Sequence, residues 1–280
     1  MRSMILLAAL LSIAAPAAQA RPKAPAAADW RTPEAENVLV IDTTHGRVIV
    51  ELVPEVAPGH VERLKVLARK GAYDGRTFFR VIDRFMAQTG DPQDTGEGGT
   101  DLPNLKAEFT FRRDAASGFV TASSPWGAEE GFLRSLPVVS QAWSWSDMTQ
   151  DGKVAAWGSY CPGVVGMARD DNPDSANSQF FLMRQPYLSL DKRYTAFGRV
   201  ISGLEAIRAI KTGEPVAAPQ DRMDRVRVLA DIPAAERPSV KVIDPASAWF
   251  KAEIARVRKQ KGADFSLCDV TIPVEVNSNP

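Results

Sequence analysis

The stretch FFRVIDRFMAQTGD, residues 78–91, decides the fold of this chain. Its aromatic and β-branched residues predict two short strands, at 77–82 and at 85–88. Side chains alternate between the two faces of a strand, so Phe78 is expected in the core. Arg80 interrupts the apolar pattern. Taken alone, such an arginine is more often a structural residue paired with an acid.

Outward from this stretch, short β-rich runs are separated by turn signals. Runs at 38–42 and 47–52 are joined through a His-Gly turn, which predicts a hairpin. One helix is expected to open at Pro58 and a second to span 203–210. Further strands are expected at 105–111, 163–168, 178–183, 195–200 and 225–230. Many short strands with two helices indicate a mostly β fold, a closed antiparallel barrel.

Composition excludes several classes of protein. The 280 residues are 45% hydrophobic and 24% charged, which is ordinary for a globular chain of one large or two smaller domains. Lys+Arg and Asp+Glu are both 34, so the basic footprint of a nucleic-acid-binding protein is missing. Two Cys and two His do not have zinc-site spacing. The Gly-rich run at 95–100 lacks the Lys-Ser/Thr of a phosphate loop, so no cofactor or metal is expected.

The first 20 residues, MRSMILLAALLSIAAPAAQA, resemble a secretory signal peptide. Arg2 precedes a short apolar run, and small residues end at Ala20 in an A-x-A pattern. The alternative is a membrane helix that is retained, but the run is short for a span and Pro16 interrupts it. We therefore expect a periplasmic protein with no membrane span after cleavage. Residues 21–36, rich in Ala and Pro, are expected to form a linker.

Two segments exceed a minimal barrel. Residues 112–160 form a long connection with four of the six Trp, either an extra packing layer or a lid that extends a binding groove. Residues 232–280 form a C-terminal extension. Within it, 246–261 has the pattern of an amphipathic helix whose apolar face packs on the barrel.

Cys161 and Cys268 are the two cysteines of the chain. In an oxidising compartment they are able to pair. Two buried free thiols are the alternative, because separation in sequence does not tell whether two Cα atoms lie within disulfide reach. The sequence leaves this question open.

Downstream of the opening stretch, GMAR at 166–169, NSQFF at 177–181 and Leu-Asp at 190–191 follow in order. Together with residues 78–91 they resemble the cyclophilin family of peptidyl-prolyl cis–trans isomerases. The resemblance covers residues 37–231, interrupted by the insertion at about 112–160. It implies an eight-stranded antiparallel barrel with a helix closing each end.

The resemblance also implies roles for individual residues. Arg80 matches the catalytic arginine of the family, and Gln88 matches the glutamine beside it. The remaining matches are substrate-binding: Phe85, Met86, Phe181 and Leu190 for the proline pocket, Gln179 for the peptide groove, Ala168 and Arg169 for the strand whose backbone pairs with bound peptide, and Tyr194 where eukaryotic members often have His.

The chain departs from the family pattern at a few positions. Asp83-Arg84 replaces a Pro-Gly turn, and Thr89 replaces a Gly. Ser189 lies where a Trp often precedes the leucine, which puts binding of drug-type cyclic peptides in doubt. None of these changes removes the arginine or the pocket.

The resemblance implies isomerisation of X-Pro bonds in exported proteins, with proline-containing peptides and unfolded or partly folded chains as partners. Two other functions stay open: a non-catalytic chaperone or binding module on the same barrel, and a ligand-binding barrel that only shares the motif. The intact set of Arg80, Phe85, Met86, Gln88 and Phe181 favours the enzyme. A ligand cavity inside the barrel favours the last alternative.

Overall fold

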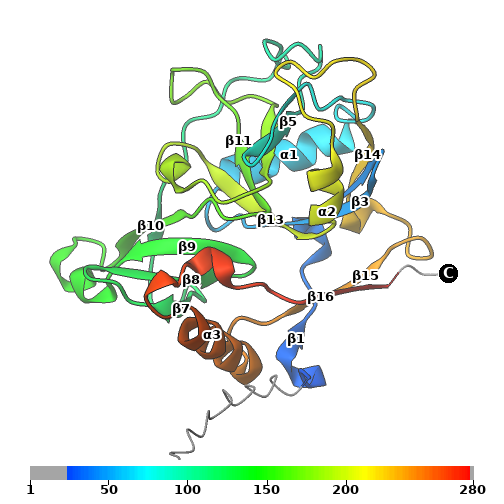
Figure 1. The fold of residues 1–280 in the computed structure, drawn as a ribbon. Coiled ribbons are helices and arrows are strands. Elements are labelled where there is room, and N and C mark those ends of the chain that lie inside the picture. The colour runs from blue at the N-terminus through cyan, green and yellow to red at the C-terminus, as the bar shows by residue number, and fades with distance from the viewer. Residues whose placement is uncertain (1–23, 278–280) are drawn as a thin grey trace, which may run out of the picture.

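The computed structural model describes residues 24–277 of the chain. Its largest element is an eight-stranded antiparallel sheet that curves into a barrel (Figure 1). In sheet order the strands are β14 (Met223–Val228), β2 (Val38–Thr43), β3 (Gly46–Leu52), β13 (Ala196–Ser202), β11 (Val164–Met167), β12 (Phe180–Met183), β5 (Met86–Thr89) and β4 (Arg80–Ile82). The predicted mostly β, eight-stranded cyclophilin-like architecture is confirmed.

The ends of this sheet meet next to β4 and β14. Thr77 forms an antiparallel bridge with Arg222, and the Phe78 N–H donates to the Asp221 carbonyl at 2.8 Å. The predicted hairpin is β2 and β3, where Gly46 closes the turn at a φ of +115°, a conformation that glycine adopts readily. Backbone groups at the seam are therefore paired within the barrel.

The barrel interior is a single apolar core. Helix α1 (Pro58–Arg69) contributes Val61, Leu64 and Leu67, and the short helix α2 (Leu204–Ala209) contributes Ile207. Phe78 and Phe180 lie in this core, as strand alternation predicts. Because the interior is packed with side chains, the described cavities lie on the outer surface of the barrel.

The insertion is a second antiparallel sheet of five strands, drawn in green in Figure 1. In sheet order it contains β6 (Phe111–Arg113), β10 (Val154–Gly158), β9 (Leu136–Gln141), β8 (Ala128–Leu133) and β7 (Val120–Ser123), with the 3-10 helix η3 (Trp143–Met148) between β9 and β10. We expected a long connection here, and that expectation is wrong. The expected strand at 105–111 is also wrong: Leu105 makes an isolated bridge to Ala176, and Phe111 begins β6.

The tryptophans of the insertion have different surroundings. Trp126, in the β7–β8 turn, is fully exposed. The rings of Trp143 and Trp157 instead lie beside cations, Arg113 at 5.4 Å and Lys192 at 3.7 Å from the ring centroids. The first contact lies within the insertion, and the second joins the insertion to a loop of the barrel.

A third, three-stranded sheet joins both ends of the described chain. Its order is β1 (Trp30–Arg31), β15 (Ser239–Ile243) and β16 (Val274–Asn277). The expected linker at 21–36 is therefore wrong for its described part, because Trp30 pairs with Ile243. This part also contains the 3-10 helices η1 (Ala27–Asp29) and η2 (Ala35–Asn37).

A buried ion pair holds this N-terminal strand. The Arg31 guanidinium donates to both carboxylate oxygens of Glu51, at 2.6 and 2.8 Å, and Glu51 is only 1% exposed. The backbone N–H of Ser135, from the inserted sheet, donates to the same carboxylate at 3.1 Å. One carboxylate thus joins β1, the barrel and the insertion.

The C-terminal extension shares an apolar cluster with both the inserted sheet and the barrel. Helix α3 (Ala248–Lys261) begins at Ser247, whose hydroxyl accepts the Phe250 N–H. Its apolar face, Phe250, Ile254 and Val257, is buried in one apolar cluster with residues of the inserted sheet, β2, β3 and β15, and the Phe250 ring meets Phe132 of β8 with centroids 5.3 Å apart. The remaining 3-10 helices are η4 (Leu188–Leu190), η5 (Leu229–Asp231), η6 (Gly262–Asp264) and η7 (Leu267–Asp269).

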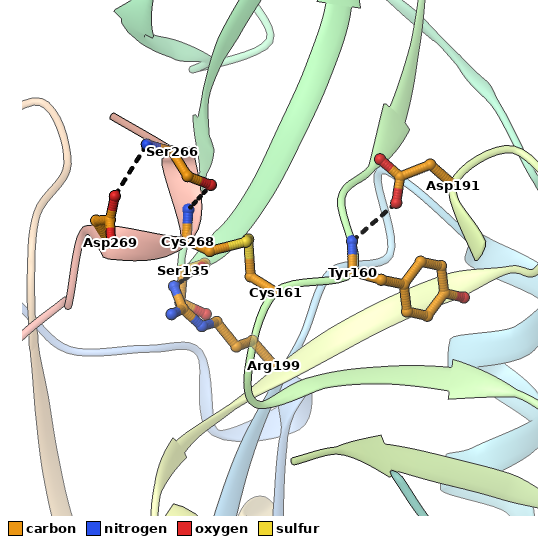
Figure 2. Close-up of a disulfide and its surroundings, with 8 residues drawn as sticks. All are labelled: Ser135, Tyr160, Cys161, Asp191, Arg199, Ser266, Cys268 and Asp269. Atoms are coloured by element: carbon orange, nitrogen blue, oxygen red, sulfur yellow. Dashed lines mark hydrogen bonds between the residues drawn. A yellow bond between two sulfur atoms is a disulfide. The ribbon is translucent and has the colours of Figure 1, made fainter. Parts of the chain in front are cut away.

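Cys161 and Cys268 are joined by a disulfide, with their Cα atoms 5.0 Å apart (Figure 2). Cys161 directly follows Tyr160 in the segment between β10 and β11, and Cys268 lies in η7. The bond ties the C-terminal extension to the barrel. The expected signal peptide, residues 1–20, lies outside the described residues. Among residues 24–277, no helix has the length and apolar character needed to cross a bilayer.

Candidate active site

Arg80 stands at the rim of a surface cavity, on the first residue of β4. The register of β4 with β5 places it opposite Gln88. Its Nη1 donates to Gln88 Oε1 at 3.2 Å, and its Nε donates to Glu214 Oε1 at 2.5 Å. The arginine side chain remains 38% exposed, so the guanidinium is held at its position and still open to the cavity.

A relay of side-chain amides fixes Gln88. Its Nε2 donates to Gln179 Oε1 at 3.0 Å. Gln179 in turn donates through its own Nε2 to the backbone carbonyls of Gly96 and Gly98, at 3.0 and 2.8 Å. In both amides the nitrogen donates to the next member of the relay and the oxygen accepts from the one before it. This arrangement orients the Gln88 oxygen toward Arg80.

The Gly-rich loop on which this relay ends is held by Asp91. Backbone N–H groups of Gln93, Gly96 and Gly98 donate to its carboxylate. Burial raises the pKa of Asp91, but these hydrogen bonds outweigh it and keep the pKa below its usual range. A Cβ at Gly98 would lie 2.0 Å from the Asp91 carboxylate, so this loop requires glycine there.

The opposite wall of the cavity is apolar. On β5 and β12 the side chains of Met86 and Phe181 point to the outer face, whereas their neighbours Ala87 and Leu182 fill the barrel core. Phe85, from the turn between β4 and β5, completes this wall with Leu190 and Tyr194. These residues line one slot beside the guanidinium.

The slot is supported from behind by Tyr160. Its buried ring lies nearly parallel to that of Phe181, with centroids 5.8 Å apart. Gly166 makes this approach possible, because a Cβ there would lie 2.6 Å from Phe181 Cζ and 2.6 Å from the Tyr160 hydroxyl oxygen. The Tyr160 N–H donates to Asp191 at 2.9 Å, as Figure 2 shows, and burial raises the pKa of Asp191 to about 6.

The inserted sheet also lies behind this wall. Leu136, Val138 and Ala156 belong to the same buried apolar cluster as Met86 and Phe181. Residues 112–160 supply none of the residues that line the cavity. Of the two functions considered for the insertion, the structure favours the packing layer.

The cavity has a volume of about 590 Å³. It brings together all the predicted site residues except Gln179: Arg80, Phe85, Met86, Gln88, Ala168, Arg169, Phe181, Leu190 and Tyr194. Gln179 lines an adjoining cavity of about 360 Å³ that shares Gln88, Gly96, Glu97, Ala168 and Arg169 with the first. The two cavities form one continuous groove.

Sequence reasoning missed several residues of the groove. They are Phe79, Thr95, Gly96, Glu97, Glu214 and Pro215. Strand alternation left Phe79 unassigned, and the Gly-rich loop was recognised only as a tight turn. Glu214 has no local signal, because it is more than 130 residues from Arg80 in the chain.

The Ala168–Arg169 segment borders the groove just after β11. The Ala168 N–H already donates to the Gln179 carbonyl at 2.9 Å, so it is not free for a ligand. The Arg169 side chain donates to the Arg193 and Asp170 carbonyls and lies over the Tyr194 ring at 4.5 Å. This arginine therefore forms part of the wall of the groove.

The arrangement places one oriented cation beside an apolar slot. Within residues 24–277, no three potential metal-ligating side chains gather. Hydrogen-bond donors held next to an apolar surface stabilise charge or lone-pair density that develops on a bound molecule. The groove is thus suited to stabilise a transient electronic change in an uncharged ligand.

A family model described as cyclophilin type peptidyl-prolyl cis-trans isomerase/CLD matches residues 38–231. A probable peptidyl-prolyl cis-trans isomerase of Brucella suis biovar 1 (strain 1330) is 35% identical over 189 residues, which are 64% of this chain and 73% of that protein. Peptidyl-prolyl cis-trans isomerase B of Bacillus subtilis (strain 168) is 32% identical over 168 residues, 60% of this chain and 85% of its own length.

Among solved structures, cyclophilin AquaCyp293 from Hirschia baltica is similar with a TM-score of 0.83 and 32% sequence identity. The likeness covers 90% of this chain and 94% of that one. It therefore extends beyond residues 38–231 into the segments added to the barrel.

Proposed function

This chain belongs to the family of cyclophilin-type peptidyl-prolyl cis–trans isomerases, and from that premise we propose that Arg80 and the apolar slot beside it carry the reaction. The chain is a peptidyl-prolyl isomerase that acts on proline-containing peptides. The proposal concerns which of its residues do so, and for which proteins.

The reaction requires a partial double bond to rotate. Resonance in the X-Pro amide makes the barrier about 18–20 kcal/mol, and uncatalysed exchange takes tens to hundreds of seconds. In the twisted state the resonance is lost, and the proline nitrogen becomes a better hydrogen-bond acceptor. A guanidinium N–H of Arg80 directed at that nitrogen stabilises the twisted state more than either planar state, and this difference is catalysis.

The rest of the groove holds the substrate in place. We assign Phe85, Met86, Phe181 and Leu190 to the proline ring, whose burial excludes water and strengthens the contact from Arg80. Gln88 orients Arg80 through the 3.2 Å hydrogen bond. An acceleration of about 10⁴-fold requires only about 5.5 kcal/mol, which one charge-assisted contact plus orientation is able to supply.

The observation that carries the proposal is the exposed guanidinium of Arg80 beside an open apolar slot. Arg80→Ala should lower kcat/KM on a short X-Pro peptide by about 100-fold or more and leave the circular dichroism spectrum unchanged. Arg112→Ala is a matched control, because it removes an exposed arginine paired with an acid in the inserted sheet. A folded Arg80→Ala protein with wild-type turnover would contradict the mechanism and favour a non-catalytic binding module.

We further propose that the clients are exported proteins in the periplasm. The signal-peptide pattern of residues 1–20 supports export, and a disulfide is typical of oxidising compartments. The test is N-terminal sequencing of the protein from a periplasmic extract, which should begin at Arg21. Intact Met1 on protein found only in the cytosol would overturn this.

A further inference from the structure

We propose that Glu214 is a positioning residue that sets the orientation of Arg80 for isomerisation. The inference rests on the proposed function of Arg80 and adds a second side chain to it. Glu214 lines the same cavity as the apolar slot, and its Oε1 accepts the Arg80 Nε–H at 2.5 Å.

Backbone pairing with β4 positions Glu214 beside Arg80. Gly213 and Val81 exchange two hydrogen bonds of 2.8 Å, and the Val216 N–H donates to the Phe79 carbonyl at 2.9 Å. Phe79 and Val81 are the two chain neighbours of Arg80. The loop is therefore tied to β4 on both sides of the arginine, which puts residues 214 and 215 across from it.

The same loop is closely packed at Gly213. A Cβ on Gly213 would lie 2.7 Å from the Val216 Cα and 2.8 Å from the Pro215 carbonyl oxygen. The Lys211 side chain closes the loop further by donating to the Ala217 carbonyl at 2.7 Å. The carboxylate of Glu214 thus starts from a fixed backbone, although its side chain is 55% exposed.

The contact uses one edge of the guanidinium and leaves another free. The Nε–H donates to Glu214 and an Nη1–H donates to Gln88, whereas Nη2 donates to none of the residues that the structure describes. Two contacts on different nitrogens define the plane of the group, so the N–H groups of its open edge keep a constant direction at the rim of the cavity. A guanidinium is a rigid, planar fork, and fixing its plane fixes all its donors.

The role predicts a specific kinetic pattern. An arginine without this contact samples more rotamers, and only a fraction of them direct an N–H at the prolyl nitrogen. The loss should appear in kcat, while KM should change little, because the apolar slot that binds proline is untouched. Glutamine keeps an acceptor oxygen at the same position and should restore the orientation.

The experiment is a double-mutant cycle on a short X-Pro peptide. Glu214→Ala should lower kcat by about tenfold with KM nearly unchanged, and Glu214→Gln should stay within about twofold of wild type. In the Arg80→Ala background, Glu214→Ala should have no further effect. Glu205→Ala, which removes the exposed partner of Arg208 on α2, is the control for loss of an ordinary surface ion pair.

The outcomes separate this proposal from the one it rests on. If Arg80→Ala is slow but Glu214→Ala turns over like wild type, or if Glu214→Gln is as slow as Glu214→Ala, the positioning role is wrong and the role of Arg80 stands. If Arg80→Ala is itself as fast as wild type, the proposed mechanism fails first.

A spectroscopic readout is independent of turnover. In the wild-type protein the Arg80 Nε–Hε group should give its own NMR resonance with slow side-chain motion. In Glu214→Ala it should move toward the position of a free arginine, and in Glu214→Gln it should remain distinct. An unchanged Arg80 resonance in Glu214→Ala would overturn the proposal even if the variant were less stable.

Discussion

The barrel lines the groove, whereas the inserted sheet and the C-terminal extension do not. All the residues that line the groove come from the barrel strands and their loops, at residues 79–98, 168–194 and 214–215. The inserted sheet instead shares a buried cluster with the back of the apolar wall, and the C-terminal extension is tied to the segment beside Tyr160. The barrel thus supplies the chemistry, whereas the added layers support it from behind and should affect stability more than turnover.

The disulfide is the sharpest test of this difference. The Cys161→Ser/Cys268→Ser double variant opens a loop of 107 residues and should lose about 4 kcal/mol of unfolding free energy. Turnover of a short X-Pro peptide by the folded fraction should remain within about twofold of wild type. Urea denaturation and peptide turnover at low temperature measure the two effects. Loss of turnover in a protein that is still folded would show that the added layer takes part in the chemistry.

A cavity in the inserted sheet should have the next largest effect. Leu136 is fully buried in the cluster behind the slot, so Leu136→Ala should cost about 3 kcal/mol of stability. Leu182→Ala, at an equally buried position inside the barrel, is the matched comparison. Similar losses in one shared transition by calorimetry would mean that the sheet and the barrel unfold together. Two separate transitions would make the insertion an independent unit.

Asp191 lies at the junction of the two regions, and its titration should have a smaller effect. Its pKa of about 6 in the folded protein exceeds the value of about 3.9 in an unfolded chain. The folded state therefore holds the proton more tightly, and stability should fall as pH rises from about 4 to about 6, then level off. Asp191→Asn should lack this fall, measured by urea denaturation across that range. Parallel curves for the two proteins would contradict the expectation.

Trp126 should have the smallest effect. Its side chain is fully exposed in the β7–β8 turn, so Trp126→Ser should change stability by no more than about 0.5 kcal/mol and leave peptide turnover unchanged. The measurement that matters is binding of a long unfolded protein. Weaker binding with unchanged turnover would give the insertion a client-binding surface in addition to its packing role.

The sequence predicted the barrel well because its signals are local. The stretch at 78–91 contains the alternation that directs Met86 outward and Phe78 inward, and both follow from the period of a strand. Of the ten site residues that the family resemblance implied, nine line one cavity. The arginine and the apolar slot could thus be predicted from the sequence.

The rest depended on contacts between distant segments. The insertion was not recognised as a sheet because apolar and polar residues alternate only weakly along its strands. The close approach of β7 to β8 requires glycine at position 131, because a Cβ there would lie 2.1 Å from the Val120 carbonyl oxygen. Glu214 reaches Arg80 through the pairing of Gly213 with Val81. No spacing rule in the sequence predicts a partner so distant in the chain.

The strand β1 sets the order in which this molecule can be completed. Its partner residues in β15 come more than 200 positions later, so a nascent chain cannot form this pair until Val242 and Ile243 have emerged. The earliest described strand therefore finds its partner only after every strand of the barrel has been synthesised, because β15 follows all of them in the chain.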